Sequence, residues 1–547
     1  MVFFTMQRAN HIDALSGQLF DMVVIGGGAT GAGTALDAAS RGYKVLLLEK
    51  NDFGAATSSK STKLIHGGVR YLEQAFKKLS VGQYRMVKKA LHERTTLLRL
   101  APHITQPLQL ITPCRTWLEA CYYYVGLKLY DFISGKSHIG KSRWMSQQQA
   151  LQALPALAAQ KMVAAVAYYD GQLDDSRYNL ALIQTAQQYG AICINHISVT
   201  ALQKNETGKI TGLHCSDTLT GNSYTLATKV VINATGPFAD HIRLMANKQL
   251  TPRIRVSKGV HMVLPRTVWP GQSAMLIPKT ADGRIIFAIP YKQHLLIGTT
   301  DEEDNLTEKA FGPSTKDVQY LLQYLNDYLQ HPVTENEVLA GFGGQRPLVQ
   351  QAGSNSTKDL IRDHEIEIDA PSGLISVLGG KWTTYRLMAK DAVDAAGNML
   401  GTPRACITAT LSLVGSQQYN STTVINQVDF LPDFIVQHLL KTYGDQSIVI
   451  IQLARQQPAL AALILPGLPY TYAELQYVVS KEMAFTIEDV ISRRWGVDLL
   501  NWEMAIELAK PVGKWMGEYM QWTTQQEARY TTEYMQQIQL LIQQSRL

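Results

Sequence analysis

Cysteine is scarce in this 547-residue chain, and its five cysteines lack C-x-x-C spacing. An odd number without such spacing predicts neither a disulfide framework nor a zinc site, and it fits a reducing compartment. The sequence has no D-x-[DN]-x-[DN]-G calcium loop, so no metal is expected. It also lacks an apolar run of membrane-spanning length, and no cleaved signal peptide is expected.

Charge is moderate and dispersed. No block rich in lysine or arginine occurs, which argues against nucleic acid as a partner. The formal net charge of +6 is mild for this length and suits an anionic substrate or an anionic lipid surface. With 46% hydrophobic and 18% charged residues, the composition is that of a globular chain with room for two or three domains.

A glycine-rich turn near the N-terminus carries the clearest motif. Gly26, Gly28 and Gly31 form G-x-G-x-x-G between a short apolar run and a helix of small residues. Gly26 permits the tight turn, Gly28 lets a pyrophosphate approach the backbone, and Gly31 lets the helix lie close to the sheet. Glu49 ends the next strand, where its carboxylate can bind both ribose hydroxyls and would repel a 2′-phosphate. The pattern predicts a dinucleotide site for FAD or NAD and disfavours NADP.

Three later segments are also suited to holding a cofactor. The loop over 53–72 is rich in small and hydroxyl residues, which can contact the cofactor's phosphates and ring. A predicted strand over 230–232 ends in A-T-G, which allows close backbone approach at the carboxyl edge of a sheet. Lys381 lies at a glycine-rich helix start that would stabilise negative charge on reduced flavin. The predicted cofactor-binding residues are Gly26, Gly28, Gly31, Glu49, Thr57, Ser58, Ser59, His66, Gly67, Gly68, Ala234, Thr235, Gly236, Gly380, Lys381 and Thr383.

These segments predict an α/β fold, with a Rossmann-like FAD-binding domain, a β-sheet substrate domain and a C-terminal helical domain. No second G-x-G-x-x-G follows a strand, so a separate NAD(P)H domain is not expected. The FAD-binding domain is predicted to be discontinuous, with the substrate domain inserted and Gln-rich helices following. The predicted ranges are about 18–78, 165–240 and 341–400 for FAD binding, 79–164 and 241–340 for the substrate domain, and 403–547 for the helices.

Two helical stretches stand outside these motifs. Residues 115–135 carry an aromatic cluster in an amphipathic pattern that Glu119, Lys128 and Asp131 interrupt. These charges exclude a membrane span, and packing inside the protein is favoured over contact with a lipid interface or a partner. Near the C-terminus, a T-x-x-D sequence predicts a capped helix from Thr486 to Arg494.

A distributed set of motifs resembles the family of FAD-dependent glycerol-3-phosphate dehydrogenases. The set is D-x-V-V-I-G-G-G-x-x-G, T-S-S-K-S-T-K-L-I-H-G-G-V-R-Y-L, I-N-A-T-G-P, G-x-R-P-L and G-G-K-W-T-T-Y-R, over about residues 21–396. The resemblance implies oxidation of sn-glycerol 3-phosphate to dihydroxyacetone phosphate at FAD, with electrons passed to a membrane quinone. A close branch of the family is an oxidase that uses oxygen instead. By matching positions, the resemblance implies a substrate and catalytic group of Arg70, Tyr71, His261, Arg346 and Lys381.

The resemblance and the composition together give further expectations. We expect the FAD to be bound without a covalent link, because no attachment residue is obvious. We expect a cytoplasmic enzyme, peripherally associated with the cell membrane, that reduces quinone faster than oxygen. A homodimer is compatible with the sequence. Trp382 departs from the smaller apolar residue of other family members, which concerns local packing and not the chemistry.

Two questions stay open at the level of sequence. Removal of the C2 hydroxyl proton needs a base, for which His261 is the first candidate and His66 the rival. A rigid guanidinium fork suits a phosphate dianion, which favours glycerol 3-phosphate modestly over an amino acid, so an amino-acid oxidase is the weaker alternative. A flavin-binding scaffold or a nucleic-acid-modifying protein would need a basic face or interleaved aromatic residues, and neither is visible.

Overall fold

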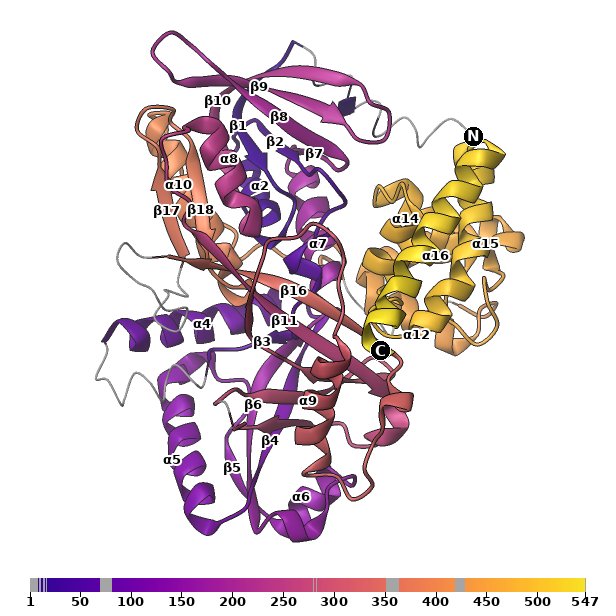
Figure 1. Cartoon of the computed structure of the whole chain (residues 1–547). Coiled ribbons are helices and arrows are strands. Elements are labelled where there is room, and N and C mark those ends of the chain that lie inside the picture. The colour runs from indigo at the N-terminus through magenta and orange to yellow at the C-terminus, as the bar shows by residue number, and fades with distance from the viewer. Residues whose placement is uncertain are drawn as a thin grey trace.

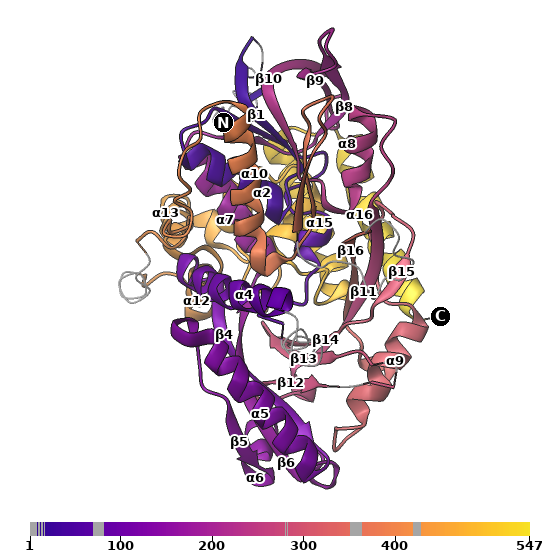
Figure 2. The same cartoon turned by 90° about the vertical axis from the view of Figure 1, so that its left-hand side faces the viewer.

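The computed structural model describes residues 17–68, 81–278, 280–281, 283–350, 364–418 and 428–546, together with residues 8, 11, 12 and 15. These residues form two β-sheets, the helices that cover them, and a group of C-terminal helices (Figures 1 and 2). The arrangement confirms the predicted α/β class with a helical C-terminal part. Two predicted site residues, Arg70 and Tyr71, lie outside the described residues.

The first sheet is built around parallel strands that are apolar on both faces. Its order is β17 (His364–Ile368), β18 (Ile375–Gly379), β10 (Ser223–Asn233), β1 (Leu19–Ile25), β2 (Val45–Leu48) and β7 (Ile192–Ile194), and β9 (Ile210–Asp217) joins β8 (Ile197–Lys204) to β10. Strands β18, β10, β1, β2 and β7 run parallel. Every residue of β2 is buried, as expected for a strand covered on both sides.

Three helices pack together on one face of this sheet (Figure 2). They are α2 (Ala29–Ser40), α7 (Asp175–Gln188) and α10 (Tyr385–Met399), and they share one apolar core with β1, β2 and β10. Small residues in α2 allow the close packing, because a Cβ on Gly33 would lie 2.6 Å from the ring of Tyr385. The glycine turn therefore leads from β1 directly to the N-terminus of α2, at the carboxyl edge of the sheet.

The second sheet carries the longest strands of the predicted substrate domain. Its order is β15 (Glu302–Asp304), β11 (Ile254–Pro265), β14 (His294–Gly298), β13 (Ile286–Tyr291), β12 (Ala274–Ile277), β4 (Thr105–Cys114), β6 (Ala164–Leu173) and β3 (Leu64–Ile65), with β16 (Ala340–Val349) on β11 and β5 (Arg143–Ser146) on β6. The helices α6 (Gln147–Ala153) and α9 (Thr315–Asn326) share a core with one face. The predicted FAD-binding segments 165–240 and 341–400 each start in a strand of this second sheet and enter the first sheet later. We keep the division into domains as a proposal.

The C-terminal helices lie together beside both sheets (Figure 1), and they share an apolar core with α5 and strands of the second sheet. They are α12 (Asp433–Tyr443), α13 (Ser447–Gln456), α14 (Tyr472–Lys481), α15 (Trp502–Met520) and α16 (Thr524–Arg546). The predicted cap forms, because Thr486 Oγ1 accepts from the N–H of Asp489 and the Asp489 carboxylate accepts from the N–H of Thr486. The turn that follows is a π-helix over Asp489–Trp495, where the sequence predicted an α-helix. Arg493 and Arg494, near the end of this turn, both donate to a single carboxylate, that of Asp52.

Helix α5 (Trp117–Ser134) packs against the second sheet by one face only. The buried apolar residues of this face are Ala120, Leu127, Tyr130 and Ile133. The opposite face exposes Trp117, Leu118, Tyr122, Val125 and Phe132, by 50% to 81%. The predicted packing inside the protein is therefore right for one face of α5 and wrong for the other, because apolar residues lie on more than one side of the helix. None of the described helices is both long and apolar enough to cross a membrane.

Candidate active site

A cavity of about 340 Å³ lies at the carboxyl edge of the first sheet. Segments that the sequence singled out separately meet in its wall: the glycine turn, the end of β2, the loop after it, the A-T-G segment after β10, and the G-G-K segment after β18. The lining includes the predicted residues Gly26, Gly28, Glu49, Thr57, Ser58, Ala234, Thr235, Gly236, Gly380 and Lys381. The other predicted cofactor residues, Gly31, Ser59, His66, Gly67, Gly68 and Thr383, are not part of this lining.

The glycine turn has the geometry that a pyrophosphate needs. Gly26 has a φ of +106°, which other residues rarely adopt. A Cβ on Gly31 would lie 1.8 Å from the carbonyl oxygen of Gly26, so only glycine fits where the helix meets the turn. A Cβ on Gly28 would lie 2.8 Å from Ser58 Oγ, which accepts a hydrogen bond from the N–H of Ala29 at 2.9 Å. Gly28, Ala29 and Thr30 line the cavity, so the start of α2 borders it, and these residues fit a dinucleotide.

Glu49 lies at the edge of the cavity with both carboxylate oxygens oriented by the backbone. The N–H of Gly27 donates to Oε2 at 2.6 Å, and the N–H of Asn51 donates to Oε1 at 2.9 Å. Burial raises the pKa of Glu49, and these two hydrogen bonds oppose the rise. A carboxylate fixed in this way has lone pairs left for further donors, and its binding to ribose hydroxyls stays a prediction.

The loop after Glu49 contacts several elements, and not the cavity alone. Thr57 Oγ1 donates to the carbonyl of Gln345 at 2.6 Å, which ties the loop to β16. The backbone of His66 exchanges hydrogen bonds with Thr383 Oγ1 at 3.3 and 3.4 Å. The N–H of Gly67 donates to the hydroxyl of Tyr130 at 2.9 Å, so this glycine packs against α5. The loop therefore joins the first sheet to the second.

His261 is a buried, neutral imidazole on β11. It is 2% exposed and stacks on Phe342 with ring centroids 4.9 Å apart. Its Nε2 lies 3.0 Å from Thr62 Oγ1, while its Nδ1 has no hydrogen-bond partner within the described part of the chain. Burial lowers the pKa of His261 well below its usual value, and the nearby cations Arg346 and Lys63 lower it further. The imidazole is thus unprotonated at neutral pH and can accept a proton.

Glycines on the neighbouring strands make room for His261 and for Arg346. A Cβ on Gly298 of β14 would lie 2.1 Å from His261 Cδ2, and a Cβ on Gly259 of β11 would lie 2.2 Å from Arg346 Nη2. The Arg346 guanidinium donates to Thr299 Oγ1 at 2.9 Å and to Asp301 Oδ1 at 3.3 Å. Its side chain remains one-third exposed. The second sheet therefore presents a cationic fork close to a neutral base.

The rival base, His66, is also neutral. Burial lowers the pKa of His66 to about 4, with further lowering by Lys381 and Arg94. Its loop connects to the G-G-K segment through Thr383. Since both imidazoles are unprotonated at neutral pH, the pKa values do not choose between His261 and His66. Of the predicted catalytic group, the structure thus brings His261 and Arg346 together and places Lys381 on the cavity wall, with His66 beside it.

The structure adds residues that the sequence analysis missed. Lys63 is 2% exposed, and its Nζ donates to Asp175 Oδ1 at 2.5 Å and to the carbonyl of Ser59 at 2.8 Å. Asp175 also accepts from the N–H of Ser61 at 3.0 Å, so the buried pair fixes the loop on both sides of Thr62. A lysine in a polar motif is expected at the surface, and only the contact of Lys63 with Asp175 of α7 shows that it is buried.

Comparisons with known proteins agree with this geometry. A sequence model of the family described as FAD dependent oxidoreductase matches residues 21–392, and one described as the C-terminal domain of alpha-glycerophosphate oxidase matches residues 406–527. The chain is 42% identical to the probable mitochondrial glycerol-3-phosphate dehydrogenase of Caenorhabditis elegans, over 93% of this chain and 72% of that protein. It is also 42% identical to the mitochondrial glycerol-3-phosphate dehydrogenase of Mus musculus, over 94% of this chain and 73% of that protein.

Solved structures show the same relationship. The glycerol-3-phosphate dehydrogenase of Bacillus halodurans, crystallised with FAD, superposes with a TM-score of 0.79 at 29% identity, covering 98% of both chains. The L-alpha-glycerophosphate oxidase of Mycoplasma pneumoniae, determined with FAD bound, shares the fold with a TM-score of 0.54 at 19% identity, covering 71% of this chain and 97% of that one. The cofactor of this fold is FAD, and the cavity residues fit it.

Proposed function

We propose that this chain, which belongs to the family of FAD-dependent glycerol-3-phosphate dehydrogenases, oxidises sn-glycerol 3-phosphate to dihydroxyacetone phosphate. The observation that carries the proposal is the neutral imidazole of His261 beside the guanidinium of Arg346, on the sheet that borders the FAD cavity. The direct test is anaerobic reduction of the bound FAD by sn-glycerol 3-phosphate, with glycerol as the control for the phosphate.

The residues divide the work between cofactor and substrate. We assign the glycine turn to the pyrophosphate of FAD, Glu49 to its ribose, and Lys381 to negative charge on its ring. When bound, FAD supplies the acceptor for the hydride that leaves C2 of the substrate. Arg346 binds the phosphate dianion, because its planar fork offers two donors at once and stays charged. His261 takes the proton from the C2 hydroxyl.

Two buried contacts support His261 in this role. Thr62 Oγ1 holds Nε2 at 3.0 Å, and the ring of Phe342 fixes the plane of the imidazole. Because the site is buried and Arg346 is close, His261 is neutral before the reaction, so its ring has a nitrogen lone pair that can accept the C2 hydroxyl proton. Arg70 and Tyr71 remain proposed members of this group from the family motif alone.

We further propose a peripheral membrane enzyme that passes its electrons to quinone. The support is the exposed apolar face of α5, which carries Trp117, Leu118 and Phe132 at 62%, 81% and 80% exposure. Exposed cations lie on this helix or close to it in sequence, at Arg115, Lys128, Lys136, Lys141 and Arg143. Apolar side chains next to basic ones suit the headgroup region of an anionic bilayer. The relatives from Caenorhabditis elegans and Mus musculus are both named as mitochondrial glycerol-3-phosphate dehydrogenases.

A substitution in α5 tests this membrane proposal. Phe132→Glu should weaken binding to anionic vesicles by about 2 kcal/mol, because it removes one apolar anchor and adds a negative charge. Co-sedimentation with phosphatidylglycerol vesicles at low and high salt measures the effect. Phe434→Glu, on an exposed aromatic of α12, makes the same chemical change elsewhere and should leave binding unchanged. Equal binding by both variants would remove α5 from the interface.

The acceptor is tested with the unmodified enzyme. After reduction by substrate without oxygen, reoxidation by a soluble quinone should be faster than reoxidation by air-saturated buffer. Faster reoxidation by air, without salt-sensitive vesicle binding, would assign the chain to the oxygen-using branch instead. In that case the exposed face of α5 would contact a partner other than a membrane.

A further inference from the structure

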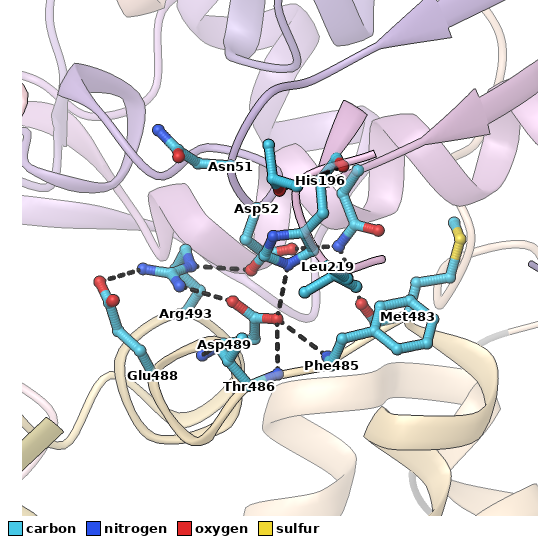
Figure 3. Close-up of polar contacts among 12 residues, drawn as sticks. Asn51, Asp52, His196, Leu219, Met483, Phe485, Thr486, Glu488, Asp489 and Arg493 are labelled. Atoms are coloured by element: carbon cyan, nitrogen blue, oxygen red, sulfur yellow. Dashed lines mark hydrogen bonds and ion pairs between the residues drawn. The ribbon is translucent and has the colours of Figure 1, made fainter. Parts of the chain in front are cut away.

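A buried cluster of charges joins the C-terminal helices to the loop that follows β2 (Figure 3). Asp52, in that loop, is completely buried. Its carboxylate accepts from Arg493 Nε at 2.7 Å, from Arg494 Nη2 at 3.0 Å, and from Arg494 Nη1. Asn195 Nδ2 adds a further hydrogen bond at 2.8 Å. Two guanidiniums from the C-terminal part of the chain thus neutralise one carboxylate near the FAD cavity.

The same cluster contains a second buried carboxylate (Figure 3). Asp489 accepts from Arg493 Nη2 at 2.7 Å and from His196 Nε2 at 2.9 Å. Burial lowers the pKa of His196, but the charge and hydrogen bond of Asp489 and the charge of Asp52 together outweigh it, so the net direction is upward. Ligand atoms of Asp52, His196 and Asp489 lie within 4.8 Å of one another, close enough for a metal ion. The arginines already satisfy both carboxylates, so we assign the cluster to ion pairing.

The loop that Asp52 anchors also shapes the FAD cavity. The N–H of Asn51 donates to Glu49 Oε1 at 2.9 Å, and the carbonyl of Asn51 accepts from the N–H of His196 at 2.8 Å. Glu49 and Asn51 both line the cavity. The chain of contacts therefore runs from the C-terminal π-helix, through Asp52 and Asn51, to the Glu49 carboxylate on the cavity wall. Asp52 is held by ion pairs and hydrogen bonds, Asn51 precedes it directly in the chain, and the N–H of Asn51 donates to Glu49.

We propose that Arg493 and Arg494 are positioning residues for FAD. By holding Asp52, they keep Asn51 and Glu49 in the conformation that binds the dinucleotide, although neither arginine belongs to the cavity wall. Docking of the C-terminal helices and binding of FAD are then coupled. By thermodynamic linkage, the coupling acts equally in both directions. This assigns to the C-terminal helices a role in retaining the cofactor.

A variant of Arg494 tests the first direction. Arg494→Met keeps a long side chain but removes the fork, and it should raise the Kd of FAD for the apoprotein by about tenfold or more. The readout is quenching of flavin fluorescence as apoprotein is added. With FAD at saturation, the KM for the substrate should stay unchanged, because Arg494 does not touch the substrate site. Arg494→Lys, which keeps the charge, should fall between Arg494→Met and the unmodified chain.

Lys292→Met provides the matched control. Lys292 Nζ donates to the carbonyl of Trp495 at 3.2 Å, so it contacts the same π-helical turn without touching Asp52. This variant should leave the Kd of FAD unchanged. If both variants weaken FAD equally, the arginines only support the fold, and an unchanged Kd in Arg494→Met overturns the proposal outright.

The second direction needs no substitution, which keeps the proposal testable if Arg494→Met fails to fold. Removal of FAD from the unmodified chain should speed hydrogen exchange in Asp489–Trp495. Helix α9 (Thr315–Asn326), on the second sheet, should exchange at the same rate with and without FAD. Equal exchange of the π-helical turn in both forms would overturn the coupling.

Discussion

Replacing His261 by Asn should lower kcat by roughly 10²- to 10⁴-fold, the usual contribution of a general base. Asparagine is similar in size but cannot accept the substrate proton. The same change at His66 should have a much smaller effect on kcat, because the backbone of His66 makes its contacts with Thr383. Steady-state rates with saturating substrate measure both variants. A large loss in His66→Asn with a normal His261→Asn would reverse the assignment of the base.

The pH profile should follow the same residue. The pKa of His261 in the folded free enzyme lies well below 6.5, because of burial and the nearby cations. The unprotonated form is therefore present at neutral pH and is lost as the pH falls through this lowered pKa. We expect kcat/KM to stay level from pH 8 down to below about 6.5. An acid limb centred above that value would contradict the lowered pKa.

Replacing Arg346 by Lys should lower kcat/KM for sn-glycerol 3-phosphate, with a loss of about 1.5–3 kcal/mol in transition-state stabilisation. A single ammonium keeps the charge but cannot make the two parallel hydrogen bonds of a guanidinium. Glycerol, which has no phosphate, should lose much less. Arg255→Lys is the control, because Arg255 lies on β11, the strand paired with the β16 strand of Arg346, and it pairs with Glu303 at the surface. Equal losses for glycerol and its phosphate would mean that Arg346 supports the fold.

The sequence predicted those parts of the site that are encoded locally. Gly26, Gly28, Gly31 and Glu49 form one strand–turn–helix–strand unit, and their backbone geometry follows from residues close in sequence. Where a Cβ would clash, the position must be glycine, so the requirement can be recognised from a single sequence motif. The Thr486–Asp489 cap was predictable for the same reason.

Contacts between distant segments were not predictable in this way. Lys63 pairs with Asp175, and Asp52 with Arg494, across 112 and 442 positions of sequence. From sequence, each of these charged residues is expected at the surface, because its burial can be inferred only when its oppositely charged partner is known. The sequence also did not show which face of α5 is exposed, because its aromatic residues are spread around the helix.

The most direct test is the absorbance of the bound FAD in the absence of oxygen. Addition of sn-glycerol 3-phosphate should bleach the flavin band within the turnover time, and glycine or proline at the same concentration should not. The amino acids are the relevant controls, because glycine oxidase and proline dehydrogenase share the fold. Bleaching by an amino acid, with none by glycerol 3-phosphate, would contradict the account.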